Sequence, residues 1–435
     1  MSISFSNPGP VDLSSAASQT ETLRAGAGRA EIQLPDELFP TEGFTGVQDL
    51  LHARLLLLES GKKLAFVSIE LTSLPAEQVV AMQKAVADAA GLLPENVVIC
   101  VTHTFSAPHF LPSHLCKTPA DQQKNDLLFQ AIKAAVCKAT SQAFAEMQTA
   151  RFGCETGFCD VNVNRDIPTA DGWWLGSNET GPSDKSVTVL RFETLQGNPI
   201  ALLFSYAVQS SVMDGAEMSG GGRLVSADLT GAASRFIEQE YGETITALFC
   251  LGAAADQAPS LKAKYQYVGK DGHIRVEDIH ERGFSIAELL GKRLGIEVLR
   301  LAEKTECQSL ANSIFKEKQM VACPGQEIID MRLIRPTHQY AFVPAGERVE
   351  PVEIIRLGDV TLIGVRPELG CLTAASIKAQ SPLDKRILLT MVNGAAKYMP
   401  EQNAYDRITY EAMNSPFARG SAELLCTRLA ELLRC

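Results

Sequence analysis

The chain has 435 residues, of which 46% are hydrophobic and 21% are charged, a mixture that excludes a disordered or fibrous protein. Its 40 basic and 51 acidic residues give a net charge of −11, which disfavours broad electrostatic binding of nucleic acid or of an anionic membrane surface. The apolar runs are too short to cross a bilayer, and the first residues lack the pattern of a secretory signal. We therefore expect a cytoplasmic protein with a small-molecule substrate, no nucleic acid partner and no membrane insertion, and a homo-oligomer stays open.

The organisation of the chain predicts one large folded unit. Residues 1–24 are rich in Ser, Pro and Thr and predict an extended or disordered arm, and residues 25–435 predict a single α/β domain without a clear linker. Eleven cysteines are scattered without regular spacing, and several lie in apolar runs where a free thiol behaves as a small hydrophobic side chain. Reduced cysteines are the simplest interpretation.

Strands and helices alternate along the whole chain. In the first half we predict strands at residues 52–59 and 63–71 with a turn between them, a helix at 75–90, a strand at 96–102 and a helix at 121–147. In the second half we predict strands at 186–194 and 199–208, a helix at 228–240, a strand at 244–252, a helix at 279–302, a hairpin at 352–365, a strand at 386–394 and a terminal helix. This alternation predicts an α/β fold.

Several polar side chains follow directly after apolar strands. They are His103, Gln209, Asp256, Glu368 and Tyr398. Open α/β sheets bind ligands outside the carboxyl ends of their strands, where loops converge on one crevice. The recurrence therefore favours one shared pocket.

The segment Thr102–Pro108, THTFSAP, resembles the THTHS[AG]P motif of the neutral/alkaline non-lysosomal ceramidases. Further segments resemble motifs of the same family in the same chain order, and together the matches cover about residues 24 to 415. They are RAGAGRAEI from Arg24, DLLHAR from Asp49, NVNR from Asn162, SADLTG from Ser226, GAAADQAP from Gly252, and a closing block from Asn393-Gly and Tyr398 to Tyr410-Glu-Ala.

The resemblance implies a fold and a metal site. The fold would be stacked mixed β-sheets flanked by helices, and the activity that of a zinc-dependent amidohydrolase. The family holds zinc with two histidines, a glutamate and a tyrosine, which fall on His103, Gln209, Glu368 and Tyr398 in this sequence. Exchanging histidine for glutamine leaves one nitrogen and three oxygens, a harder set than zinc prefers. Zinc therefore remains the first expectation by resemblance, Mg²⁺, Mn²⁺ and Ca²⁺ become alternatives, and so does an empty site.

The residues that would act on the substrate are kept in part. The arginine and tyrosine beside the family's scissile carbonyl match Arg165 and Tyr410, which could stabilise an oxyanion. Glu368 or Asp256 could move protons. The family's active-site serine falls on Ala258, so a serine-dependent step is not available there.

Aromatic residues near these motifs suggest substrate contacts. Phe105 stands where the family has a second histidine, and Trp173 and Trp174 lie in a polar, Gly-containing loop. Large rings in such a loop either cover a pocket or fill an apolar gap. Purely structural roles are alternatives for three of the polar residues. Asp228 could be a helix N-cap, Asp256 a turn anchor and Arg165 an ion-pair partner.

Three functional hypotheses follow. The first is a metal-dependent hydrolase of an amide or related acyl bond in a small soluble substrate. Ceramide itself is not expected, because a signal peptide and room for the family's C-terminal immunoglobulin-like domain are not evident. The second is a carbohydrate or hydroxy-acid isomerase or lyase using the same pocket, motivated by Phe105 and the tryptophans. The third is a non-catalytic binding protein with a degenerate metal site, motivated by Gln209 and Ala258.

Overall fold

The structure is a computed structural model that describes residues 22–111, 115–310, 313–380 and 385–434. Most of the arm predicted at residues 1–24 lies outside the described residues. Arg24, which the arm was expected to include, already belongs to the first strand, β1, at Arg24–Ile32.

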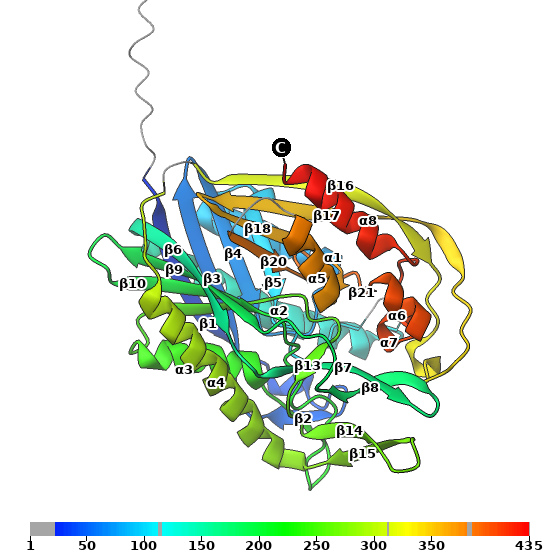
Figure 1. The fold of residues 1–435 in the computed structure, drawn as a ribbon. Helices are drawn as coiled ribbons and strands as arrows, with labels where there is room; N and C mark the ends of the chain where they lie inside the picture. Colours follow the sequence, from blue (N-terminus) through cyan, green and yellow to red (C-terminus); the bar gives the residue numbers. More distant parts are fainter. Residues whose placement is uncertain (1–21, 112–114, 311–312, 381–384, 435) are drawn as a thin grey trace, which may run out of the picture.

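A large mixed sheet forms the centre of the fold (Figure 1). It has eight strands in the order β12-β10-β9-β6-β1-β3-β4-β5, and its neighbours run antiparallel except for the parallel pairs β4–β5 and β10–β12. Besides β1, its strands are β3 (Leu51–Ser60), β4 (Lys62–Ile69), β5 (Val97–Val101), β6 (Gln148–Phe158), β9 (Ser186–Thr194), β10 (Pro199–Tyr206) and β12 (Thr246–Leu251).

Four long helices cover one face of this sheet. They are α1 (Ala76–Ala90), α2 (Pro119–Ala145), α3 (Asp228–Glu240) and α4 (Gly283–Lys304), and they enclose a core of Leu, Val, Ile and Ala side chains. The glycines of β1 explain how closely α2 approaches. A Cβ added at Gly26 would lie 2.1 Å from the Ala143 carbonyl oxygen, and one added at Gly28 would lie 2.2 Å from that of Ala139. Only glycine permits this contact.

A second sheet packs on the other face. It has the order β16-β17-β18-β20, with β16 at Phe315–Gln326, β17 at Pro344–Leu357, β18 at Val360–Val365 and β20 at Lys385–Leu389. Buried side chains of both sheets, such as Leu203 and Leu362, form the core between them. The helices α5 (Cys371–Gln380) and α8 (Ser421–Leu432) cover its outer face. The layers are thus helix, sheet, sheet and helix, which confirms the predicted stacked mixed sheets flanked by helices.

Small sheets and short helices complete the fold beyond the ends of the large sheet (Figure 1). They are β2 (Phe44–Val47) with β11 (Arg223–Val225), β13 (Gln257–Pro259) with β7 (Asn162–Thr169) and β8 (Gly172–Asn178), β14 (Lys264–Val268) with β15 (Ile274–Asp278), β19 (Glu368–Leu369) with β21 (Tyr398–Met399), and the helices α6 (Gln402–Arg407) and α7 (Tyr410–Met413). The segment around Trp173, predicted as a loop, is strand β8, because it pairs with β7 as a hairpin.

Two further features bear on the predictions. None of the helices in the described ranges has the length and hydropathy to span a bilayer. The ten cysteines within the described part of the chain are all free thiols.

Candidate active site

The predicted polar residues come from the ends of strands in both sheets. His103 follows β5 and Gln209 follows β10, and their loops join through a parallel bridge between Thr104 and Ser210. Glu368 follows β18, and it pairs in parallel register with Tyr398, which follows β20. The carboxyl ends of β5 and β10 in one sheet therefore lie near those of β18 and β20 in the other, and the carboxyl ends of strands are the usual place of ligand sites in α/β folds.

The imidazole of His103 is fixed on one side and lacks a hydrogen bond on the other. Its backbone has a φ of 56°, an uncommon conformation for a residue other than glycine, and its side chain is buried. Nδ1 donates to the Thr72 carbonyl oxygen at 2.7 Å, which fixes the ring and directs Nε2 toward Glu368. Nε2 lies 3.0 Å from Glu368 Oε2, yet it forms no aligned hydrogen bond with any described residue. The Phe105 ring packs edge-on at 4.7 Å and closes one side of the imidazole.

Gln209 and Arg165 form the second half of the cluster. The Gln209 amide nitrogen donates to Glu368 Oε2 at 3.1 Å, and its oxygen accepts from Arg165 Nη1 at 2.6 Å. Arg165 in turn donates through Nε to Glu411 Oε1 at 2.8 Å, and its backbone N–H donates to the Asp256 carbonyl at 2.9 Å. The structure thus turns the nitrogen of Gln209, and not its oxygen, toward Glu368.

Two tyrosines stand over the guanidinium of Arg165. The Tyr398 ring centre lies 5.4 Å and the Tyr410 ring centre 5.8 Å from Arg165 Cζ, within the range of cation–π contact. Asn414 donates to the Tyr410 hydroxyl oxygen at 3.2 Å, which leaves the hydroxyl hydrogen for another acceptor. Trp174 packs edge-on against the Tyr410 ring at 5.7 Å and supports its orientation.

Burial sets the protonation of these groups. Burial favours the neutral form of Glu368, but the contact with His103, and then the charge of Arg165, hold the pKa of Glu368 below its ordinary value. Burial, and then the Glu368 charge, raise the pKa of Tyr398 well above its ordinary value. Burial likewise raises the pKa of Tyr410. At neutral pH the site therefore holds a carboxylate beside two neutral phenols.

A cavity of about 800 Å³ opens onto this cluster. Phe105, Arg165, Gln209, Tyr398 and Tyr410 are among the residues that line it. Tyrosine, valine and isoleucine side chains of β14, β15 and α4 line the other walls, together with Lys262 and Lys264. A cavity of this size and mixed lining suits a small molecule with an apolar part.

Asp256, predicted as a catalytic residue, does not line the cavity. Its carboxylate accepts from the Cys371 N–H at 3.0 Å and from the Asn164 side-chain amide at 3.2 Å, so it joins the end of β12 to the start of α5. Burial raises the pKa of Asp256. These contacts describe a turn anchor, and a role in proton transfer stays a prediction.

The tryptophans also lie behind the cavity wall. Trp173 packs against the guanidinium of Arg407, whose Cζ is 4.8 Å from the ring centre, and neither Trp173 nor Trp174 lines the cavity. Direct contact of either ring with a substrate stays a prediction. Ala258 does line the cavity, and it presents a methyl group where the family has a serine.

Two residues of the matched motifs, Glu411 and Asp228, hold the site together, and the sequence did not single them out for this role. Glu411 follows Tyr410 in the quoted block and forms the main ion pair of Arg165, at 2.6 Å between Nη2 and Oε1. Its position directly after a matched tyrosine was a usable signal. Asp228 was an alternative for a helix N-cap, but the N-cap of α3 is Ala227 and Asp228 is the first residue of the helix. Its carboxylate accepts hydrogen bonds from Ser106 at 3.0 Å and from the Met213 N–H at 2.8 Å. It thereby ties the His103 loop to the Gln209 loop.

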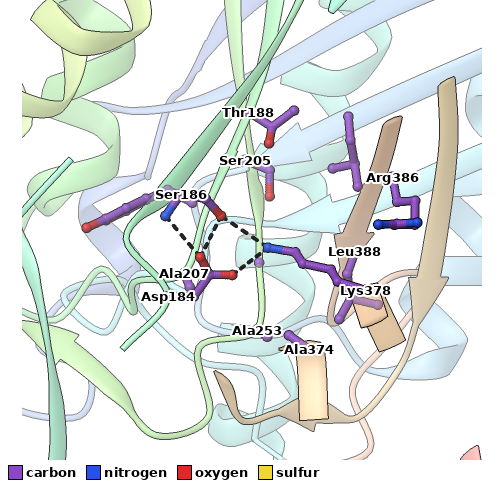
Figure 2. A pocket seen from close by; sticks show the side chains of 13 residues that line it. Asp184, Ser186, Thr188, Ser205, Ala207, Ala253, Ala374, Lys378, Arg386 and Leu388 are labelled. Atoms are coloured by element: carbon purple, nitrogen blue, oxygen red, sulfur yellow. Dashed lines mark hydrogen bonds and ion pairs between the residues drawn. The ribbon is translucent and has the colours of Figure 1, made fainter. Parts of the chain in front are cut away.

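A second, much smaller cavity lies between β10 and α5 (Figure 2). Lys378 Nζ pairs with Asp184 at 2.7 Å and with Ser186 at 3.1 Å, and the Ser186 hydroxyl also donates to Asp184 at 2.5 Å. Its volume of about 30 Å³ is that of one water molecule. It is too small for a substrate. The cavity of about 800 Å³, which adjoins the His103–Glu368 pair through Gln209 and Tyr398, is the candidate active site.

Comparisons with known proteins identify the family. The family described as neutral/alkaline non-lysosomal ceramidase, N-terminal, matches residues 40–271. The neutral ceramidase of Drosophila pseudoobscura pseudoobscura is 25% identical in an alignment 268 residues long, which covers 55% of this chain and 36% of that protein. The neutral ceramidase of Drosophila melanogaster is 23% identical in an alignment 352 residues long, which covers 71% of this chain and 48% of that protein.

A solved structure gives the same answer for the fold. The crystal structure of neutral ceramidase from Pseudomonas aeruginosa matches with a TM-score of 0.73 at 17% identity, covering 95% of this chain and 74% of that one. The chain spans only about a third to a half of the length of the two curated relatives. Since the family match covers more than half of the sequence, this chain belongs to the neutral/alkaline non-lysosomal ceramidase family.

Proposed function

We propose that this chain is a metal-dependent hydrolase of an amide or related acyl bond in a small substrate. The observation that carries the proposal is the buried pair formed by His103 Nε2 and Glu368 Oε2, which lie 3.0 Å apart. Glu368 contacts Gln209 and pairs in register with Tyr398, and both of these residues line the large cavity. Nε2 has no aligned hydrogen bond among the described residues. A buried imidazole nitrogen of this kind beside a carboxylate needs a partner, and a cation bound between the two groups supplies one.

The retained donors fit a divalent cation. His103 and Glu368 would hold it, with Tyr398 beside Glu368 in register as the third protein ligand. The hydrogen bond from Nδ1 to Thr72 is the arrangement that orients a ligating imidazole. Within the described ranges no cluster of three or more His, Cys, Asp and Glu side chains is arranged for a metal, so the phenol is essential to this fit. Zinc is proposed first from the resemblance, with Mn²⁺ or Mg²⁺ as alternatives.

The chemistry of the proposal divides between cation and protein. A bound divalent cation would supply Lewis acidity for polarising an acyl oxygen and acidifying water. Tyr410 would donate its free hydroxyl hydrogen to the substrate carbonyl oxygen. Arg165, held by Glu411, would stabilise the negative charge that develops there.

The cavity supports a substrate with an apolar part and a polar end. Tyr267, Val268 and Val276 offer apolar surface for an acyl chain, and Lys264 lies in the same wall. The volume of about 800 Å³ suits a small molecule, and this supports the proposal of a small soluble substrate. Free cysteines in the described part of the chain support a reducing, cytoplasmic location.

The test combines metal analysis with a substrate panel. Purified protein would be assayed on fluorogenic N-acyl amides and esters of increasing chain length, with Zn²⁺, Mn²⁺ or Mg²⁺ added after removal of bound metal. We expect turnover that requires a cation and that His103→Ala and Glu368→Gln abolish. His273→Ala, which changes an exposed histidine paired with Asp171, is the control and should keep full activity. Absence of turnover with every cation would overturn the proposal.

One observation favours a second candidate, a non-catalytic binding protein. Ala258 removes the family's hydroxyl from the cavity wall, and Gln209 directs hydrogens, not a lone pair, toward Glu368. Under this hypothesis, apolar amides would bind and raise the melting temperature without being hydrolysed. The same panel, read by thermal shift and by product formation, separates the two.

A further inference from the structure

The orientation of the Gln209 amide is fixed from both sides. The side chain is 2% exposed, its nitrogen donates to Glu368 Oε2 at 3.1 Å, and its oxygen accepts from Arg165 Nη1 at 2.6 Å. Arg165 is itself anchored by Glu411 at 2.8 Å through Nε and by its backbone N–H to the Asp256 carbonyl. The amide therefore lies between two buried charges of opposite sign, each against the matching end of its dipole.

Turning the amide over would break both contacts and create two repulsive ones. The amide hydrogens would then face a guanidinium that has only donors, and the amide oxygen would face a carboxylate that has only acceptors. A cation between Gln209 and Glu368 would relieve the repulsion between the amide oxygen and the carboxylate. It would not relieve the repulsion between the amide hydrogens and the guanidinium, because Arg165 stays anchored at Glu411. An amide binds a metal through its oxygen, so the observed orientation is not that of a ligand.

Glu368 Oε2 consequently has two neighbours, of which only one forms a hydrogen bond with it. His103 Nε2 faces it at 3.0 Å without an aligned hydrogen bond, whereas Gln209 already donates to it. Phe105 occupies the side of the imidazole at 4.7 Å, where it offers no donor atom. The space around His103 and Glu368 thus has no fourth protein ligand from Gln209 or from Phe105.

We infer that Gln209 is a positioning residue for Glu368 and not a metal ligand, so that the pocket is a three-donor site of His103, Glu368 and Tyr398 that binds divalent cations weakly and exchangeably. The inference rests on the proposed function for the identity of the pocket. It concerns affinity for the cation and not turnover. Arg165 is the residue that enforces it, through the 2.6 Å hydrogen bond to the amide oxygen.

The experiment measures Zn²⁺ affinity by competition with a chromophoric chelator, using the full chain. Wild-type protein should lose Zn²⁺ to a chelator of moderate strength. Gln209→His adds an imidazole facing Glu368, and it should raise Zn²⁺ affinity by about 100-fold or more, because zinc prefers nitrogen donors and a fourth ligand completes its tetrahedral shell. Adding His103→Ala to Gln209→His should abolish the gain. Gln266→His, which places an imidazole in the β14 wall of the same cavity, is the matched control and should leave the Zn²⁺ affinity unchanged.

A second variant keeps the test decisive if Gln209→His folds poorly. Gln209→Met preserves the length of the side chain but removes both the oxygen and the hydrogens. If Gln209 only positions Glu368, Gln209→Met should lower metal affinity by about 10–100-fold, the usual cost of losing a residue that orients a ligand, while the absorption bands of bound Co²⁺ keep their positions. Tight stoichiometric Zn²⁺ binding by the wild type, or a shift of the Co²⁺ bands in Gln209→Met, would overturn the inference.

The outcomes are separable from those of the proposed function. If Gln209→His binds Zn²⁺ tightly through His103 but neither protein hydrolyses any acyl substrate, the inference stands and the hydrolase proposal fails. If wild-type protein hydrolyses an amide only with tightly held zinc, the hydrolase proposal stands and the inference fails.

Discussion

Two buried arginines of this protein differ in how completely their guanidinium groups are hydrogen-bonded. Arg54 lies in the core on β3, 2% exposed, and its Nε and Nη2 donate to the two oxygens of Glu238 at 2.8 and 3.0 Å while Nη1 donates to Glu70 at 2.5 Å. Arg165 is 7% exposed at the cavity, and its Nη2 has no aligned hydrogen bond although Glu411 Oε1 lies 2.6 Å away.

The difference separates a structural cluster from a site. Each nitrogen of the Arg54 guanidinium has an aligned partner, so the group is a closed network with no capacity for a ligand. Around Arg165, the nearby atoms His103 Nε2 and Glu411 Oε2 lack hydrogen bonds within the described part of the chain. Buried unpaired atoms are costly, and proteins keep them mainly where a ligand completes them. His52 Nδ1, 3.7 Å from Glu70, also lacks a hydrogen bond, so the contrast lies in the two guanidinium groups: that of Arg54 is fully bonded and that of Arg165 is not.

The largest expected effect comes from opening the closed network. Arg54→Met should lower the free energy of unfolding by about 3–5 kcal/mol, because Glu70 and Glu238 would lose their main cationic partner while staying buried. Urea denaturation followed by circular dichroism measures it. Arg24→Met breaks the partly exposed Arg24–Glu59 pair and should cost no more than about 1 kcal/mol. Equal losses in the two variants would contradict the description of Arg54 as a structural centre.

The same network predicts sensitivity to acid. Burial opposes ionisation of Glu70, but Arg54, and then His52, hold its pKa at about 2 in the folded protein. A depressed carboxyl pKa stabilises the fold above the unfolded value near 4.5, and this stability disappears as the pH falls toward 2. The contribution is roughly 3 kcal/mol. Glu70→Gln should flatten this part of the stability curve between about pH 5 and 2, and an unchanged slope would contradict the assignment.

Replacing each arginine by lysine sharpens the comparison. Lysine keeps the charge but loses the planar fork, so Arg165→Lys should release Gln209 and weaken the stabilisation of the substrate oxygen. We expect kcat/KM to fall about 100-fold, the effect of removing one oxyanion donor. Arg54→Lys is the matched variant in the core and should lower the melting temperature without changing kcat/KM of the folded protein. A drop in kcat/KM for both would show that the two regions are coupled.

The smallest expected effect has the opposite sign. Burial, and then the neighbouring Glu411, raise the pKa of Asp166 well above its ordinary value, so ionised Asp166 destabilises the fold. Asp166→Asn should therefore raise the free energy of unfolding at pH 8 by about 1 kcal/mol, and the gain should shrink as falling pH protonates the wild-type carboxyl. Asp160, whose pKa is lowered chiefly by Lys185, is the control, since Asp160→Asn should not stabilise. Denaturation curves at several pH values decide this.

The sequence predicted the long regular elements because their patterns are strong. The hairpin of β3 and β4, the strand β5 and the helices α1 and α3 all occur within a residue or two of their expected limits. The hairpin of β7 and β8 was missed, since its glycine and polar residues are typical of loops and only pairing with the partner strand makes it extended. The helix α4 begins at Gly283 and not at 279, because the preceding turn around His280 is a short 3-10 helix.

The proximity of the candidate residues could be predicted from the sequence, but their bonding could not. The ends of apolar strands gave His103, Gln209, Glu368 and Tyr398, and the structure brings these residues together through contacts between the two sheets. The direction of the Gln209 amide depends on Arg165, which lies 44 residues away, so no local pattern could reveal it. The same holds for the tryptophans, whose partners Arg407 and Tyr410 come from the last part of the chain.

The origin of the cluster in two separate sheets has a mechanical consequence. His103 and Gln209 are carried by the large sheet, whereas Glu368 and Tyr398 follow strands of the second one. A ligand bridging these residues would clamp the two layers together, and its binding free energy would add directly to their resistance to separation. Binding of a ligand in the pocket should thus slow amide hydrogen exchange in β18 and β20.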